Sequence, residues 1–268
     1  MKGKTIIITG GSSGIGKACA MRFARGGAQV VIAGRTREKL QKAEAELRKI
    51  HEDVLSVVAD VSIPDDCVRI IEETIQHFGK LDVLINNAGI SMRGLFVNTE
   101  VDVVRKVMDV NFWGTVYCTK SALPHLLKTK GSIVGVSSIA GKKGLPGRTA
   151  YSASKFAMEG FLETLRTENL KNHLHVLIAC PGFTTSGIRN SALGPDGAPQ
   201  NESPRNEHEM MTAEHVADRI FKATINRKRD LVLTFNGKIV VFLNKFFPSI
   251  MDKIVYKHLS KEPGSPFK

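Results

Sequence analysis

The chain has 268 residues, of which 42% are hydrophobic, and this suits one α/β domain with a sizeable core. Its formal net charge of +12 leaves nucleic acid, an anionic membrane surface or an anionic ligand open as partners. Nowhere do eighteen consecutive apolar residues occur, which argues against a membrane-spanning helix. The first residues do not have the pattern of a secretory signal, so we expect a cytoplasmic protein.

Neither the cysteines nor the histidines have the spacing of metal ligands. The eight histidines are scattered, and the four cysteines stand singly at Cys19, Cys67, Cys118 and Cys180. Single cysteines inside apolar segments are typical of small buried side chains in a reducing compartment. We therefore predict no metal site.

Apolar runs and amphipathic stretches alternate along the chain. The apolar runs predict strands at 5–11, 28–35, 54–60, 81–89, 131–138 and 174–182, with an edge strand at 229–235. The amphipathic stretches predict helices at 14–25, 37–51, 64–78, 101–128, 151–170 and 212–226. Short apolar strands separated by helices are typical of a parallel sheet covered on both faces. We predict a single Rossmann-like, doubly wound α/β domain over residues 1–237, with a helical extension over 238–268.

The stretch TGGSSGIG at residues 9–16 follows the first predicted strand and opens the first predicted helix. Glycines at these positions allow a tight turn and close approach of a diphosphate, and the helix N-terminus offers backbone N–H groups to it. The alternative is a turn with no ligand. We predict that this stretch binds a dinucleotide through Gly10, Ser12, Ser13, Gly14, Ile15 and Gly16.

The end of the second strand bears on the choice of dinucleotide. An acidic residue there would bind the adenosine ribose and repel a 2′-phosphate, but the sequence has Gly34 followed by Arg35. A guanidinium suits a phosphate through two parallel hydrogen bonds, and Arg37 or the two serines of the turn are candidates to assist it. The alternative is a solvated arginine. We predict NADP(H) as cofactor rather than NAD(H).

With these features the sequence resembles the classical short-chain dehydrogenases/reductases over about residues 4–189. The resemblance is carried, in the family's order, by TGGSSGIG at 9–16, DV at 60–61, NNAG at 86–89, Asn111, and VSS, AYSASK and PGF at 136–138, 150–155 and 181–183. Within the family the chain is most similar to the members resembling 11β-hydroxysteroid dehydrogenase and the retinol or ketosphinganine reductases.

The resemblance implies four catalytic residues, Asn111, Ser138, Tyr151 and Lys155. Tyr151 would exchange a proton with the substrate oxygen, and a lysine one helical turn away would lower the pKa of its phenol. Ser138 would bind the same oxygen, Lys155 would also bind the nicotinamide ribose, and Asn111 would hold a water that relays protons.

Further contacts follow from the same resemblance. Asp60 and Val61 would lie beside the adenine, Asn87, Ala88 and Gly89 beside the adenosine ribose, and Pro181, Gly182 and Phe183 beside the nicotinamide. Ser186 stands where the family usually has threonine. The substrate would contact Ser138, Tyr151, Leu145 and Phe183. Relatives commonly associate through helices equivalent to 101–128 and 151–170, so a homodimer or homotetramer is expected.

The last third of the chain changes in character. Residues 190–212 are rich in Pro, Gly and Asn, as in the family's flexible substrate loop. Residues 238–259 interleave apolar side chains with lysines, which predicts contact with an anionic membrane surface, although packing over the substrate mouth or in a dimer interface would also explain them. A membrane-associated enzyme would suit a hydrophobic substrate such as a steroid, retinoid or long-chain ketone.

The sequence thus predicts an NADP(H)-dependent oxidoreductase that reduces a hydrophobic ketone or aldehyde and runs in reverse as an alcohol dehydrogenase. The alternative is a non-catalytic NADP(H)-sensing or membrane-associated scaffold protein of the same fold. Nucleic-acid binding is not expected, because a recognised module and an aromatic stacking platform are both lacking.

Overall fold

The computed structural model describes residues 1–189, 191–200 and 210–267. Its strands β1 to β7 are Thr5–Thr9, Gln29–Gly34, Val54–Val58, Val83–Asn86, Ser132–Val136, His175–Cys180 and Asp230–Val232. Its α-helices α1 to α9 are Gly14–Arg25, Arg37–Arg48, Pro64–Phe78, Val101–Met108, Gly114–Lys128, Thr149–Glu168, Ala213–Ile225, Phe235–Phe246 and Pro248–Leu259. Three short turns complete the set: η1 Phe96–Asn98, η2 Asp109–Trp113 and η3 Ile139–Gly141.

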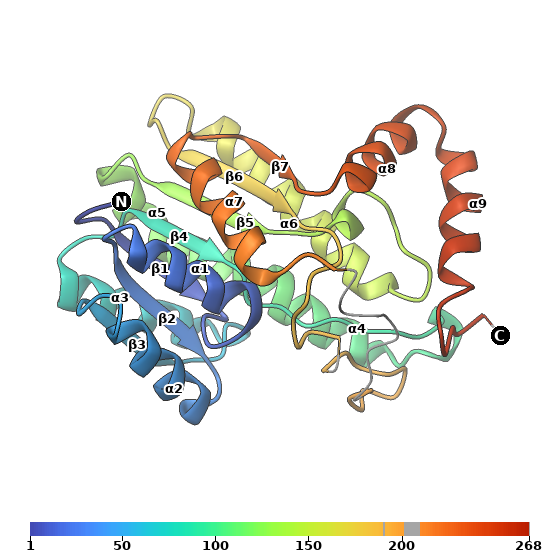
Figure 1. The fold of residues 1–268 in the computed structure, drawn as a ribbon, viewed down its shortest axis with the longest axis horizontal. Coiled ribbons are helices and arrows are strands. Elements are labelled where there is room, and N and C mark those ends of the chain that lie inside the picture. Colours follow the sequence, from blue (N-terminus) through green and yellow to red (C-terminus); the bar gives the residue numbers. More distant parts are fainter. Residues whose placement is uncertain (190, 201–209, 268) are drawn as a thin grey trace.

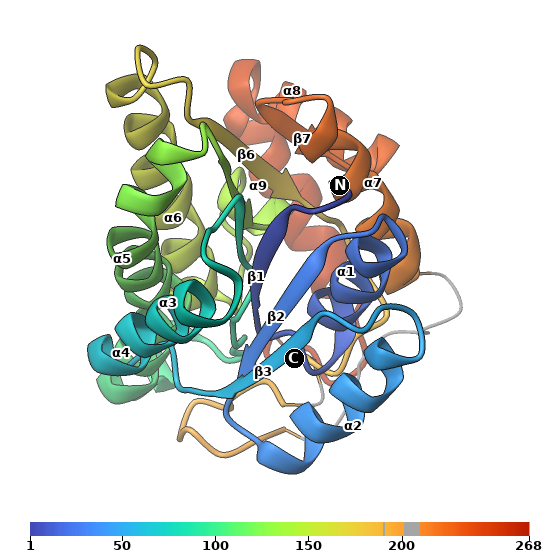
Figure 2. The ribbon, with the colours of Figure 1, turned by 90° about the vertical axis from the view of Figure 1, so that its left-hand side faces the viewer.

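In the part of the chain that the structure describes, seven strands form one parallel sheet in the order β3-β2-β1-β4-β5-β6-β7. Helices α1, α2 and α7 cover one face, and α3 to α6 cover the other (Figures 1 and 2). This is the doubly wound α/β domain that the alternating apolar runs predict. The strands are apolar throughout because both faces of the sheet are buried.

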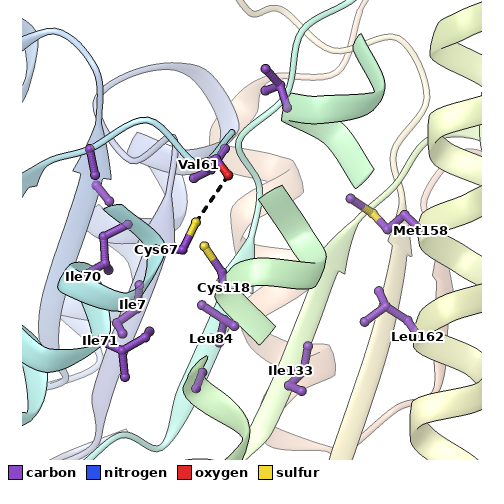
Figure 3. Packing of buried hydrophobic residues seen from close by; sticks show 14 of the residues in the cluster. Ile7, Val61, Cys67, Ile70, Ile71, Leu84, Cys118, Ile133, Met158 and Leu162 are labelled. Carbon is purple, nitrogen blue, oxygen red and sulfur yellow. Dashed lines mark hydrogen bonds between the residues drawn. The ribbon is translucent and has the colours of Figure 1, made fainter. Parts of the chain in front are cut away.

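The larger core cluster lies between the sheet and α3 to α6. In it, Cys67 of α3 and Cys118 of α5 point toward each other, and the Cys67 thiol donates a hydrogen bond to the carbonyl of Val61 at 3.3 Å (Figure 3). Both cysteines are fully buried. They pack as small hydrophobic side chains, as the sequence predicts.

The prediction of one continuous helix over residues 101–128 was wrong, because the helix is interrupted. Helix α4 ends at Met108, a π-helical turn runs over η2, and α5 begins at Gly114. The interruption includes the predicted site residue Asn111, whose amide hydrogen-bonds to protein groups outside the helix. Single π-turns inside helices often mark functional sites.

The carboxyl-terminal helices stand at the end of the sheet toward which β7 runs (Figure 1). Helix α7 begins as predicted, with the Thr212 hydroxyl accepting a hydrogen bond from the amide of His215 at 3.1 Å. Helices α8 and α9 then pack on each other beyond the sheet. In the part of the chain that the structure describes, no helix is both long and apolar enough to cross a bilayer. The predicted loop at 190–212 falls partly outside the described residues.

Candidate active site

The predicted site residues come together at one edge of the sheet. The strands are parallel, so their carboxyl ends share this edge, and the strand order reverses between β1 and β4. Ligands of doubly wound sheets bind at such a reversal. Each of six successive strands is followed here by a predicted residue: Gly10, Arg35, Asp60, Asn87, Ser138 and Pro181.

The turn after β1 has no room for a side chain at Gly10 or Gly16. Gly10 has a φ of +65°, and a Cβ on Gly16 would lie 2.2 Å from the Gly10 carbonyl oxygen. The Asn87 side-chain amide stabilises the turn by donating a hydrogen bond to the carbonyl of Thr9 at 2.9 Å. The turn leads into α1 at Gly14, and the first-turn N–H groups of a helix are suited to bind a diphosphate. This geometry fits a dinucleotide.

Three further predicted residues lie around the same turn. Gly14 has a φ of +52°, and a Cβ there would lie 3.2 Å from the Cβ of Ser186, so Ser186 stands against the turn. Ser13 precedes α1 in an extended conformation, and Ile15 packs partly against the core. Ser186 and Ser13 therefore lie where a bound diphosphate would pass.

The residues predicted to lie at the adenosine end of the site include a cation and a carboxylate. The guanidinium of Arg35 is largely exposed and lies 3.7 Å from the carboxylate of Asp60. Asp60 also accepts hydrogen bonds from Ser62, and the Ser12 hydroxyl lies beside Gly34. The Val61 side chain is buried against Gly114 and belongs to the core.

Ser138, Tyr151 and Lys155 lie together at the ends of β5 and α6. The half-buried Tyr151 phenol is hydrogen-bonded to Ser138. The Lys155 ammonium is 5.9 Å from the centre of the Tyr151 ring and donates to the Val136 carbonyl at 2.9 Å. Ser138 begins η3, where its hydroxyl also accepts from the Ala140 amide at 3.1 Å. The structure therefore brings an acid, a hydrogen-bond donor and a cation into one site.

Burial is the largest influence on the pKa values of Tyr151 and Lys155. It raises the pKa of the Tyr151 phenol above its ordinary value, although the hydrogen bond with Ser138 and the charge of Arg148 act in the opposite direction. Burial also lowers the pKa of Lys155 to about 8. The sequence led us to expect that the Lys155 ammonium lowers the phenol's pKa; in this structure the pKa is instead raised, because burial outweighs the hydrogen bond with Ser138 and the charge of Arg148.

Asn111 joins two parts of the site. Its side chain is fully buried, accepts from the Ile90 amide at 2.8 Å, and donates to the Ile90 carbonyl and the Ser154 hydroxyl at 3.0 and 2.9 Å. These bonds hold the loop after β4 against α6 at Ser154, which immediately precedes Lys155. Gly89 also packs closely against Asn111, because a Cβ there would lie 3.1 Å from the Asn111 amide oxygen.

Comparison with known proteins agrees with the dinucleotide-binding fold that this geometry indicates. The sequence profile of the family described as short chain dehydrogenase matches residues 4–194. The chain belongs to the short-chain dehydrogenase family. It is therefore an oxidoreductase with a Rossmann nucleotide-binding fold, as the motifs predict.

Two relatives and one solved structure illustrate the similarity. The chain is 35% identical to mouse dehydrogenase/reductase SDR family member 7B, over 99% of this chain and 84% of the relative. It is 45% identical to Arabidopsis thaliana 11-beta-hydroxysteroid dehydrogenase-like 4A, over 72% of this chain and 65% of the relative. A short-chain dehydrogenase/reductase from Burkholderia phymatum, solved in complex with NAD, superposes with a TM-score of 0.83 at 24% identity, covering 93% of this chain and 95% of that one.

In this short-chain dehydrogenase, the residues predicted to contact the nicotinamide and the substrate lie beside the C-terminal helices. The buried Pro181 accepts a hydrogen bond from the Ile139 amide, and Gly182 packs against Thr234. The Arg148 guanidinium lies 6.0 Å from the centre of the Phe183 ring. Leu145, predicted to contact substrate, is partly buried and packs against a small cluster from α9 formed by Met251, Val255 and Leu259. An open pocket lies between residues 143–146 and α9.

Glu159 is a buried carboxylate close to the predicted catalytic residues, and the sequence did not point to it. It accepts hydrogen bonds from Ser137 at 2.5 Å and from the Cys180 thiol at 3.4 Å, and it lies 2.6 Å from the Lys142 ammonium. It thereby connects α6 to the segments carrying Ser138 and Pro181. Its spacing of four residues from Lys155 on one helix face was the available signal.

Thr9 and Glu262 were also missed. The Thr9 hydroxyl accepts from the amides of Asn87 and Ala88, both at 3.0 Å, and so joins β1 to the motif after β4. The buried carboxylate of Glu262, in the C-terminal tail, lies 3.7 Å from Arg93 and 3.8 Å from Arg148. Thr9 stands inside the quoted glycine motif, whereas no local pattern marks Glu262.

Proposed function

We propose that the chain is an NADP(H)-dependent carbonyl reductase, reversible as an alcohol dehydrogenase, that acts on a hydrophobic ketone or aldehyde. The observation that carries the proposal is the grouping of Ser138, Tyr151 and Lys155 beside the glycine turn at the carboxyl edge of the sheet. A proton donor and a cation placed together at a dinucleotide site suit hydride transfer to a carbonyl.

When bound, the nicotinamide would supply the hydride that reaches the carbonyl carbon. Tyr151 donates its phenolic proton to the carbonyl oxygen, so that the product is an alcohol. Its raised pKa keeps the phenol protonated at neutral pH, ready to act as an acid in the reductive direction. Ser138 holds the same oxygen by a hydrogen bond, and the ammonium of Lys155 stabilises the phenolate left after the transfer. Asn111 keeps the helix that carries Lys155 in position, and a water relay from Lys155 past Asn111 is part of the proposal.

The catalytic role of Tyr151 is tested by Tyr151→Phe, with NADPH consumption followed against a panel of hydrophobic ketones and aldehydes. Loss of a general acid lowers turnover by roughly 10²- to 10⁴-fold. Tyr117→Phe on α5 is the matched control and is expected to keep normal turnover. Normal turnover in the Tyr151 variant would refute the assignment. NADPH binding by the wild type without turnover of any carbonyl would favour the scaffold alternative.

The preference for NADP(H) is supported by Arg35 and by Gly34 in place of an acid at the end of β2. The nearby Asp60 carboxylate opposes it, so binding of a 2′-phosphate requires Arg35 to turn from Asp60 to the phosphate. A lost charge-assisted hydrogen bond should weaken NADPH by roughly tenfold or more in Arg35→Ala, with NADH little affected. Calorimetric titration measures both affinities, with Lys42→Ala, an exposed position further along α2, as control. Equal weakening of both cofactors would exclude the phosphate contact.

We also propose a homodimer or homotetramer formed through α4 to α6. Apolar side chains on these helices and on the η2 turn between α4 and α5 are exposed, among them Trp113 of η2 at 42% and Phe156 of α6 at 46%. Light scattering of the wild type and of a Trp113→Ser, Phe156→Ser double variant tests this. A wild-type monomer, or an unchanged oligomer in the variant, would contradict it.

A further inference from the structure

We propose that the outer face of α8 and α9 docks on the surface of an anionic phospholipid membrane. This α8–α9 face consists of seven large apolar side chains, each at least 40% exposed: Phe235, Ile239, Phe242, Phe246, Phe247, Ile250 and Ile254. So large a group of exposed apolar side chains on adjacent helices is unusual on a protein surface and marks an interaction site. The inference is independent of the reaction proposed above.

The spacing of these residues gathers them on one side of each helix. Phe235, Ile239, Phe242 and Phe246 follow one another at steps of four, three and four residues, which places them in a single stripe on α8. The rings of Phe242 and Phe246 are 5.1 Å apart. Helix α9 already buries its other side through Met251, Val255 and Leu259. The exposed stripe is therefore an additional apolar face and not the packed side of these helices.

The charges around the face point to an anionic partner. Residues 235–261 contain one acid, Asp252, and five lysines, all of them exposed: Lys238, Lys245, Lys253, Lys257 and Lys261. Asp252 is paired with Lys143. A second copy of this face would bring like charges together, whereas anionic headgroups would neutralise them. An apolar stripe flanked by lysines is the pattern of an interfacial helix.

The face begins next to the candidate active site. Thr234, the N-cap of α8, packs against Gly182, and Gly237 packs against Ile139, which follows Ser138 in the chain. Both helices stand at the end of the sheet that carries the site (Figures 1 and 2). Docking would thus bring the substrate side of the enzyme to the bilayer, from which an apolar substrate can pass directly.

Co-sedimentation with phosphatidylcholine vesicles, with and without phosphatidylserine, tests the proposal on the full chain. The wild type should sediment with the anionic vesicles, and added salt should release it. Phe242→Ser with Phe246→Ser should weaken binding at least about tenfold, and each Lys→Gln change by about fivefold. Ile63→Ser with Leu170→Ser is the matched control, because these side chains are 49% and 66% exposed but lie elsewhere.

Two measurements separate docking from other effects. Circular dichroism melting should be the same in the face variant as in the wild type, which shows that the variant folds. Light scattering should give the same mass for both. Absent binding by the wild type, or equal loss in the control variant, would overturn the proposal. So would a change of oligomer mass in the face variant, which would assign the face to a second copy of the chain.

Discussion

Replacing Lys155 by methionine should change how the free energy of unfolding depends on pH. The side chain is only 3% exposed, and burial lowers its pKa from 10.5 to about 8. Between these two values the unfolded chain binds more protons than the folded protein, so wild-type stability rises with pH in this window. A single group with these pKa values contributes about 2 kcal/mol of that rise between about pH 7 and about pH 9.5.

Urea unfolding of the wild type and of Lys155→Met, measured in parallel across this pH range, isolates the contribution. The difference between the two free energies should shift by about 2 kcal/mol in favour of the wild type as the pH rises, because the variant has no ammonium to discharge. Lys120→Met, an exposed position on α5, is the control and should follow the wild type. Parallel curves for the wild type and Lys155→Met would refute the idea that burial strains the charged form.

Three further changes test other parts of the site. Gly16→Ala should destabilise the fold by about 1–3 kcal/mol in urea and abolish tight NADPH binding, because its Cβ would lie 2.2 Å from the Gly10 oxygen; Gly160→Ala, with open space around it, should be neutral or stabilising. Glu159→Gln should move the alkaline limit of turnover to lower pH, since losing the carboxylate lowers the pKa of Lys155 further; an unmoved pH profile would exclude that coupling. Glu262→Gln should cost about 1–3 kcal/mol of stability in thermal or urea unfolding, and no loss would show that the two arginines do not depend on it.

The fold was predictable because its strands are continuous apolar runs. A parallel sheet buried on both faces requires such runs, and β1, β2 and β6 were recognised on this ground within two residues at each end. The break before α5 was not predicted, because apolar side chains continue at helical spacing through it. Only the hydrogen bonds of Asn111 with Ile90 and Ser154, which are distant in the chain, show why the helix widens there.

Some residues of the candidate site could likewise be predicted from the sequence, and others could not. Residues within short motifs, such as the glycines of 9–16 and the pair Tyr151 and Lys155, were named because local spacing predicts their proximity. Glu262 was missed because its partners Arg93 and Arg148 lie far from it in the sequence. The pKa of Tyr151 was misjudged because burial depends on the whole fold and not on the neighbouring lysine.

The widened turn at Asp109–Trp113 has a consequence for insertions and deletions in this segment. A π-turn holds one more residue than an α-helical turn, so the segments on either side of it keep the phase of an unbroken helix. Removing one residue here would therefore close the turn while Cys118, Ala122 and Leu126 stay packed inward. We expect such a deletion to spare the packing of α5 and to disturb the position of Asn111, whose bonds with Ile90 and Ser154 depend on the widened turn.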